Sequence, residues 1–239
     1  MTGRGQILAT SGGFRQDGRR NLVPGPLVKR ALELTGKDRP RLCYLGTAMG
    51  DEPAERALIY GAFRGWSVDV SHLALYPMPS VENPRHLLLN QDVIYVGGGS
   101  VANLLALWRL HEIDGVMREA WDAGIVLTGV SAGSICWHIG GTTDSFGPEL
   151  RAVTNGLALL PYGNGVHYDS EERRRPLLQS LVAGGTLPLS FATDDGVGLY
   201  YEGTDLVEAV ADRPGVGAYR VEAVGGRAVE TRIEPRLLA

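Results

Sequence analysis

The residues of this chain best suited to covalent chemistry lie in the segment 125–137, which reads IVLTGVSAGSICW. A short apolar run at 125–128, predicted to be a strand, leads directly into GVSAG at 129–133, and residues that can start a helix follow. This G-x-S-x-G pattern is that of a nucleophile elbow, in which two glycines allow a tight strand-to-helix turn and the serine is exposed at its tip. Ser131 is therefore a candidate nucleophile. Small residues at such a turn can also serve close packing alone, so the motif by itself leaves both interpretations open.

A serine hydroxyl is a weak nucleophile until a base accepts its proton, and the five histidines of the chain are the candidates for that base. Three of them, His72, His86 and His111, fall in a predicted strand or beside predicted helices, where a solvated or satisfied histidine is the better interpretation. His138 is expected on the elbow helix, pointing away from the strand tips. His167 follows the short segment GNGV and precedes a predicted helix, so it is the candidate base.

The base needs an acid that fixes its tautomer, and the best placed acid is Asp195, in the sequence DDG at the end of a predicted strand. Asp194 is the second candidate and Asp144 the third. A lone histidine or aspartate in a loop is usually a solvated turn residue. The three residue types together at strand tips favour a Ser-His-Asp arrangement.

Alternating strand and helix signals indicate the scaffold that must position these residues. Strands are predicted at 6–10, 41–46, 66–75, 92–96, 125–128 and 187–192, and helices at 27–35, 53–64, 101–108 and 113–123. This alternation predicts an α/β fold of three layers, a mostly parallel sheet with helices on both faces. The segment 140–165 is expected to form long loops or short strands, a charged helix is expected to start near 169 or 170, and antiparallel hairpins are expected at the C-terminal edge of the sheet. We expect one domain over 1–239.

Composition excludes several classes of function. With 44% hydrophobic residues the chain can bury a sizeable core, and its net charge of −4 provides no electrostatic footprint for nucleic acid. No signal peptide and no membrane-spanning run is evident, so no membrane partner and a cytoplasmic location are expected. The two cysteines, Cys43 and Cys136, show no metal-ligand spacing and are expected to be buried. No metal and no other cofactor is expected.

A second glycine turn, GGGS at 97–100, follows the predicted strand 92–96. It lacks the Lys-Ser/Thr of a phosphate-binding loop and does not meet G-x-G-x-x-G spacing, so nucleotide binding is the weaker interpretation. Chain order also disfavours an ordinary α/β-hydrolase, in which the acid precedes a histidine near the C-terminus. Here His167 is the last histidine of the chain.

Five segments in the same order, VIYVGGGSVANLL, GVSAGS, TTD, VHY and DDG, resemble the serine peptidases of the aspartyl dipeptidase (peptidase E) and cyanophycinase family. The resemblance implies a fold related to the class I glutamine amidotransferases and a triad of Ser131, His167 and an acid. The family's acid, often glutamate, falls on Asp195 here. Backbone N–H groups of Gly98, Gly99 and Ala132 would then form an oxyanion hole, as their glycine-rich setting also suggests.

The substrate implied by the resemblance is a small peptide with an N-terminal aspartate, which requires a cation for its carboxylate. The family's arginine falls near 170 or 171, where this chain has Ser-Glu. Arg173 is the substitute if the helix is shifted by one turn, and EERRR at 171–175 is at least as well explained as a solvated helix face. Asp144 is a candidate supporting or substrate-binding residue. There are two alternatives. The substrate could be a β-linked aspartyl amide, or the chain could be a catalytically silent relative that binds a small molecule. The hairpin-rich C-terminus offers an edge that could form a homodimer.

Overall fold

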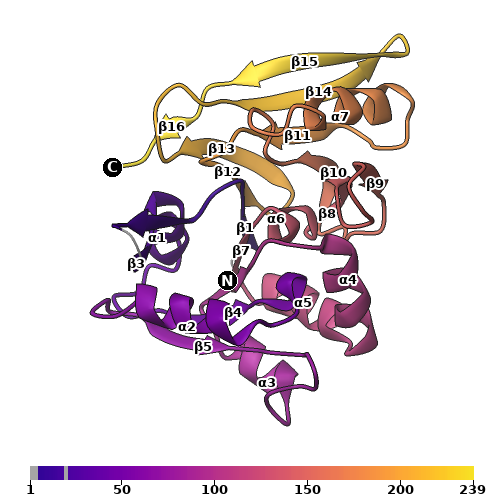
Figure 1. Ribbon diagram of the computed structural model, residues 1–239. Helices are drawn as coiled ribbons and strands as arrows, with labels where there is room; N and C mark the ends of the chain where they lie inside the picture. The colour runs from indigo at the N-terminus through magenta and orange to yellow at the C-terminus, as the bar shows by residue number, and fades with distance from the viewer. Residues whose placement is uncertain (1–4, 19–20) are drawn as a thin grey trace.

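The structure is a computed structural model that describes residues 5–18 and 21–239 (Figure 1). Its helices are α1 (Pro26–Glu33), the 3-10 turn η1 (Thr47–Met49), α2 (Pro53–Ala62), α3 (Pro84–Leu89), α4 (Val101–Leu110), α5 (Ile113–Asp122), α6 (Ala132–Ile135) and α7 (Arg174–Ala183). Its first nine strands are β1 (Gln6–Thr10), β2 (Phe14–Asp17), β3 (Asn21–Pro24), β4 (Arg41–Leu45), β5 (Asp69–His72), β6 (Val93–Val96), β7 (Val126–Val130), β8 (His138–Thr143) and β9 (Arg151–Val153). The later strands are β10 (Leu160–Gly165), β11 (Ser190–Thr193), β12 (Val197–Glu202), β13 (Asp205–Ala211), β14 (Ala218–Val224), β15 (Arg227–Ile233) and β16 (Arg236–Leu237).

The larger sheet has eight strands in the order β16-β13-β12-β1-β7-β6-β4-β5. Strands β5, β4, β6, β7 and β1 are parallel, whereas β12 runs antiparallel to β1 and forms a hairpin with β13. From β4 the chain crosses to β5 at the edge of the sheet, whereas from β6 it crosses in the opposite direction, to β7. The direction of the crossover therefore reverses between the neighbouring strands β4 and β6. Ligands of such sheets bind beyond the carboxyl ends of the strands near this reversal, where the two glycine turns also lie.

Helices cover both faces of this sheet, because its central strands are apolar on both sides. On β6, Ile94 and Val96 face the core that contains α4 and α5, while Val93 and Tyr95 face the core that contains α1 and α2. All four β6 residues are buried. The predicted α/β architecture, a mostly parallel sheet between helices, is therefore confirmed.

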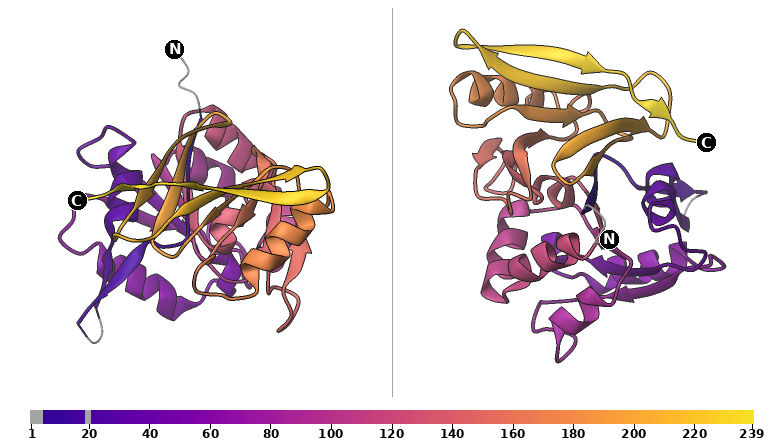
Figure 2. Two further views of the ribbon diagram at one scale, coloured as in Figure 1. Left: turned by 90° about the horizontal axis from the view of Figure 1, so that it is seen from above. Right: turned by 180° about the vertical axis from the view of Figure 1, so that it is seen from behind.

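A second sheet of six strands, in the order β15-β14-β11-β10-β8-β9, was not foreseen as a separate unit. It holds the segment 140–165 as β8, β9 and β10, and it carries the β14–β15 hairpin at the opposite end of the molecule from α2 and α3 (Figures 1 and 2). Of the two C-terminal hairpins, only β12–β13 extends the larger sheet. Strand patterns do not specify partners, so the sequence could not divide these strands between two sheets.

Two local predictions were wrong. The elbow helix α6 is a single turn that ends at Ile135, so His138 opens β8 rather than lying on a helix. The charged helix α7 begins only at Arg174. Asp51, which precedes α2, accepts hydrogen bonds from the backbone N–H groups of Leu75 and Tyr76 at 2.8 and 2.9 Å.

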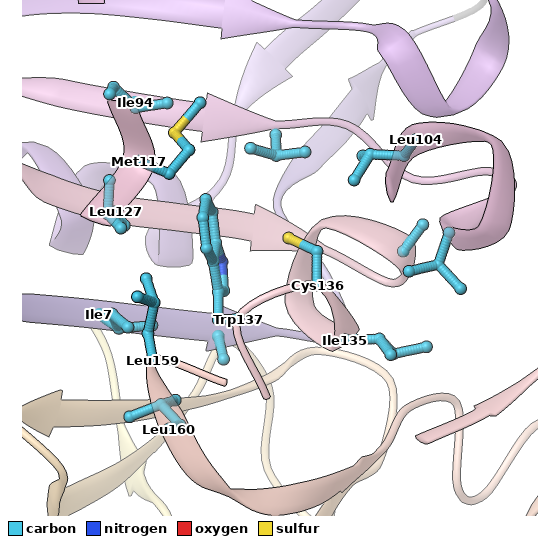
Figure 3. Packing of buried hydrophobic residues seen from close by; sticks show 14 of the residues in the cluster. Ile7, Ile94, Leu104, Met117, Leu127, Ile135, Cys136, Trp137, Leu159 and Leu160 are labelled. Atoms are coloured by element: carbon cyan, nitrogen blue, oxygen red, sulfur yellow. The ribbon is translucent and has the colours of Figure 1, made fainter. Parts of the chain in front are cut away.

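The segment after the elbow turns back into the core and anchors the turn. Figure 3 shows Trp137 among Met117, Leu127 and Leu159, with Cys136 beside it. Both Trp137 and Cys136 have 0% of their surface exposed. Burial of a large aromatic side chain stabilises the fold by about 1.5–3 kcal/mol, so the residues directly after the turn hold it in place.

Candidate active site

The elbow has the geometry that exposes a nucleophile. Ser131 lies between β7 and α6 with φ 56° and ψ −112°, a left-handed φ that costs a residue with a Cβ about 1–3 kcal/mol. The two glycines of the motif are needed for close approach: a Cβ on Gly129 would lie 2.6 Å from the carbonyl oxygen of Val96, and a Cβ on Gly133 2.3 Å from the same atom. The unfavourable backbone conformation of the elbow is therefore that of Ser131 itself.

The Gly97–Ser100 turn lies against the elbow. A Cβ on Gly98 would be 3.4 Å from the Cβ of Ser131, which places this glycine beside the serine. The N–H of Gly97 donates to Leu45 and that of Ser100 to Ala48, both at 2.9 Å. Among the described residues, the N–H groups of Gly98, Gly99 and Ala132 have no protein acceptor, so these three expected oxyanion donors are available to a ligand.

His167 and Asp195 meet as the sequence predicts. Nδ1 of His167 lies 2.5 Å from Oδ1 of Asp195, and the side chains are 22% and 33% exposed. The hydrogen bond from His167 holds the pKa of Asp195 below its usual range, against a smaller opposing effect of burial. Asp195 is therefore an ionised acceptor at neutral pH, and its contact leaves Nε2 of His167 available.

The neighbouring Asp194 has a different environment. Its Oδ2 accepts hydrogen bonds from the Gly217 N–H at 2.8 Å and from the Tyr219 hydroxyl at 3.2 Å, and the residue is 5% exposed. Burial raises the pKa of Asp194. The structure thus brings Asp195, and not Asp194, to the histidine.

Comparison with known proteins identifies the family of the chain. The model of peptidase family S51 matches residues 7–209. The chain belongs to peptidase family S51. As a member it is a serine peptidase, a hydrolase.

Relatives and solved structures cover much of this S51 chain. An uncharacterized peptidase, YgaJ, of Bacillus subtilis is 39% identical over 216 residues, which is 90% of this chain and 91% of that protein. A peptidase E of Shewanella denitrificans is 30% identical over 52% of this chain and 57% of its own length. The fold is similar to that of a peptidase from an acI-B1 actinobacterium, with TM-score 0.66, 16% identity and coverage of 98% and 96%. It is also similar to a putative peptidase E of Listeria monocytogenes, with TM-score 0.57, 15% identity and coverage of 97% and 100%.

Asp144 and Arg173 of the S51 chain lie at a separate hollow of about 360 Å³, which follows the histidine along the chain. The hollow is lined by Asp144, Pro148, Leu150, Glu171, Glu172 and Arg173. The Glu171 N–H donates to the His167 carbonyl oxygen at 3.1 Å, so the hollow begins one turn beyond the candidate base. Arg173 donates to the carbonyl oxygen of Pro148 at 3.2 Å.

Arg174 differs from the sequence-based expectation of a solvated arginine. Its side chain is 3% exposed, and its Nε donates to Glu171 at 2.7 Å. Its Nη2 lies 3.8 Å from Asp144. Arg174 therefore supports the floor of the hollow, and Arg173 is the lining arginine that a ligand can reach.

Sequence reasoning missed several polar residues around the histidine. Ser11 and Asp169 contact the backbone of His167 and Asp195, respectively: the His167 N–H donates to Ser11 Oγ at 3.3 Å, and the Asp195 N–H donates to Asp169 Oδ1 at 2.8 Å. Arg213 lies 3.5 Å from the other oxygen of Asp169. Thr-Ser-Gly-Gly at the end of a predicted strand was the available signal for Ser11, since polar residues and glycines at a strand tip mark a site edge.

Within residues 5–18 and 21–239, no group of three or more His, Cys, Asp or Glu side chains could hold a metal ion. In the same ranges no helix is long and apolar enough to cross a membrane.

Proposed function

We propose that this S51 peptidase hydrolyses small peptides through an acyl-enzyme on Ser131, with His167 as the base and Asp195 as the acid that orients it. The observation that carries the proposal is the 2.5 Å contact between His167 Nδ1 and Asp195 Oδ1. It holds the proton on Nδ1, so that Nε2 can accept the serine proton and later return it to the leaving amine. Water then resolves the acyl-enzyme. Proton transfer by a positioned group contributes about 10² to 10⁴ in rate.

The negative charge that develops on the carbonyl oxygen of the substrate requires donors at the elbow. The N–H groups of Gly98, Gly99 and Ala132 supply them in this mechanism, because none of the three has an acceptor within residues 5–18 and 21–239. Loss of one oxyanion donor typically costs about 10² to 10³ in rate.

The hollow beyond His167 is the proposed binding site for the substrate side chain, with Asp144 and Arg173 as its polar contacts. Three of its lining residues, Asp144, Glu171 and Glu172, are acidic, and Arg173 is basic. Arg174 lies beneath and pairs with Glu171. An anionic side chain would meet more carboxylates than free guanidinium groups here. These charges do not favour strict selection of an N-terminal aspartate.

A serine-directed fluorophosphonate tests the nucleophile. The wild-type protein should be labelled and Ser131→Ala should not; equal labelling of the two would show that Ser131 is not the nucleophile. Absence of labelling of both would favour a catalytically silent relative.

A dipeptide library with acidic, neutral and basic N-terminal residues, including β-linked aspartyl peptides, tests the substrate. Neutral and basic residues should be cleaved at least as fast as aspartate. Exclusive cleavage of α-linked Asp peptides would contradict our interpretation of the hollow, and exclusive cleavage of β-linked peptides would favour the alternative amide substrate.

A further inference from the structure

The carboxyl end of β1 contacts the segments that carry all three proposed triad residues. The Ser131 N–H donates to the carbonyl oxygen of Thr10 at 3.1 Å. The next residue, Ser11, accepts the N–H of His167 on its hydroxyl at 3.3 Å. The carbonyl oxygen of Ser11 accepts the N–H of Gly196, which follows Asp195, at 2.8 Å. Thr10, the last residue of β1, and Ser11, which follows it, thus connect the segments that carry the proposed nucleophile, base and acid.

The Ser11 hydroxyl is buried and firmly held. Ser11 is 2% exposed, and its Oγ lies 2.7 Å from Oγ1 of Thr193, which is 1% exposed. Thr193 ends β11, and its carbonyl oxygen accepts the N–H of Tyr168 at 3.1 Å. The Ser11–Thr193 pair therefore contacts the chain on both sides of the His167 Cα.

His167 needs such a support because its backbone is in an unfavourable conformation. Its φ is 54°, close to the 56° of Ser131, and residues with a Cβ keep such angles only where surrounding contacts impose them. The φ angle is the rotation about the N–Cα bond of His167. The N–H at this bond donates to Ser11 Oγ. Without that acceptor the residue can relax and carry its imidazole away from Asp195.

We propose that Ser11 is a positioning residue of the peptidase, whose hydroxyl holds His167 in the left-handed conformation in which its ring contacts Asp195. This inference rests on the proposed function, because Ser11 takes no part in the reaction itself and acts only through His167, the proposed base. In enzymes a displacement of about 1 Å in a reacting group can cost about 10²-fold in rate. A loss in kcat without a change in KM is therefore the expected signature.

The test compares Ser11→Ala with Ser190→Ala in the full-length protein. Ser190 is a matched control, since it has 0% exposure, lies on β11 as Thr193 does, and donates to the carbonyl oxygen of Pro188 at 2.9 Å; among the described residues it forms no hydrogen bond with His167. For Ser11→Ala we expect kcat and the fluorophosphonate labelling rate to fall by about 10- to 100-fold with KM within about twofold, the range for a small misplacement. Ser190→Ala should keep the wild-type kcat once both are corrected for the folded fraction.

Equal kcat values for Ser11→Ala, Ser190→Ala and wild type would overturn the proposal. If Ser11→Ala does not fold, Thr193→Val and Thr193→Ser address the same hydrogen bond from its other side. Valine should lower kcat and serine should preserve it; equal kcat values for these two variants would also overturn the proposal. Failure of wild type to label, or labelling of Ser131→Ala, contradicts the proposed function instead, so the two failures can be distinguished.

Discussion

Replacement of Asp195 by asparagine is the sharpest test of the site, because the neighbouring Asp194 provides a built-in control. Both are aspartates of one turn, and both are acceptors of hydrogen bonds. Asp195 accepts from the imidazole of His167, whereas Asp194 accepts from Gly217 and Tyr219. The same chemical change should therefore lower the rate at one position and the stability at the other.

The magnitude for Asp195→Asn follows from its contact with His167. A hydrogen bond to a charged group contributes about 1.5–3 kcal/mol, or roughly 10- to 160-fold in rate if it acts fully in the transition state. An amide can also select the wrong imidazole tautomer, a change that costs about 10⁴ in a serine protease triad. The Asp195 side chain is 33% exposed, so water screens part of the lost charge. We expect kcat to fall by about 10² to 10³ with little change in KM.

Asp194→Asn should leave kcat within about threefold but destabilise the fold. Because Asp194 is buried, the two groups that donate to it have few other acceptors. A buried polar group left without a partner costs about 1–3 kcal/mol. For a chain of this size that corresponds to a Tm lower by about 2–12 °C. Steady-state kinetics on a cleaved dipeptide and thermal unfolding followed by circular dichroism measure the two effects. A larger loss of kcat in Asp194→Asn than in Asp195→Asn would refute our assignment of the acid.

Three further predictions concern other parts of the molecule. Burial lowers the pKa of His138 to about 4. Between that pH and about 6.5, the ordinary pKa of histidine, the unfolded state binds more protons than the folded state. The free energy of unfolding therefore rises with pH over this range, by up to about 3 kcal/mol. Urea unfolding at pH 5 and 7.5 should show a smaller difference in His138→Gln than in wild type, and an equal difference would contradict this. Burial raises the pKa of the Cys43 thiol to about 12 and that of Cys136 well above its usual value, so neither should react with a thiol reagent at pH 8 until the protein is unfolded; rapid reaction of native protein would be the contrary result. Gly133→Ala places a Cβ 2.3 Å from the Val96 carbonyl oxygen and should abolish labelling of Ser131, whereas Gly61→Ala, an open position in α2, should raise stability by about 0.5–1 kcal/mol and keep labelling.

The sequence by itself determined the α/β class, the elbow and the candidate triad, because each is a local signal. The apolar run of β6 shows in its residue types that both faces of the strand are covered, and the glycines around Ser131 show a backbone approach that excludes a Cβ. His167 was found because it follows the segment GNGV in an expected loop, and Asp195 because it follows the predicted strand 187–192. The structure places the strands before them, β10 and β11, in the smaller sheet, whereas Ser131 follows β7 of the larger one. The family resemblance rests on the same segments and is confirmed by the match to family S51.

Only the tertiary structure decided which polar groups actually meet. A one-residue shift separates Asp194 from Asp195, and the side-chain directions at the end of β11 send the first to Tyr219 and the second to His167. The division of the strands between two sheets depends on long-range pairing, which local patterns do not encode. The support of His167 by Ser11 joins residues 156 positions apart, so it exists only once β1 lies between β7 and β12.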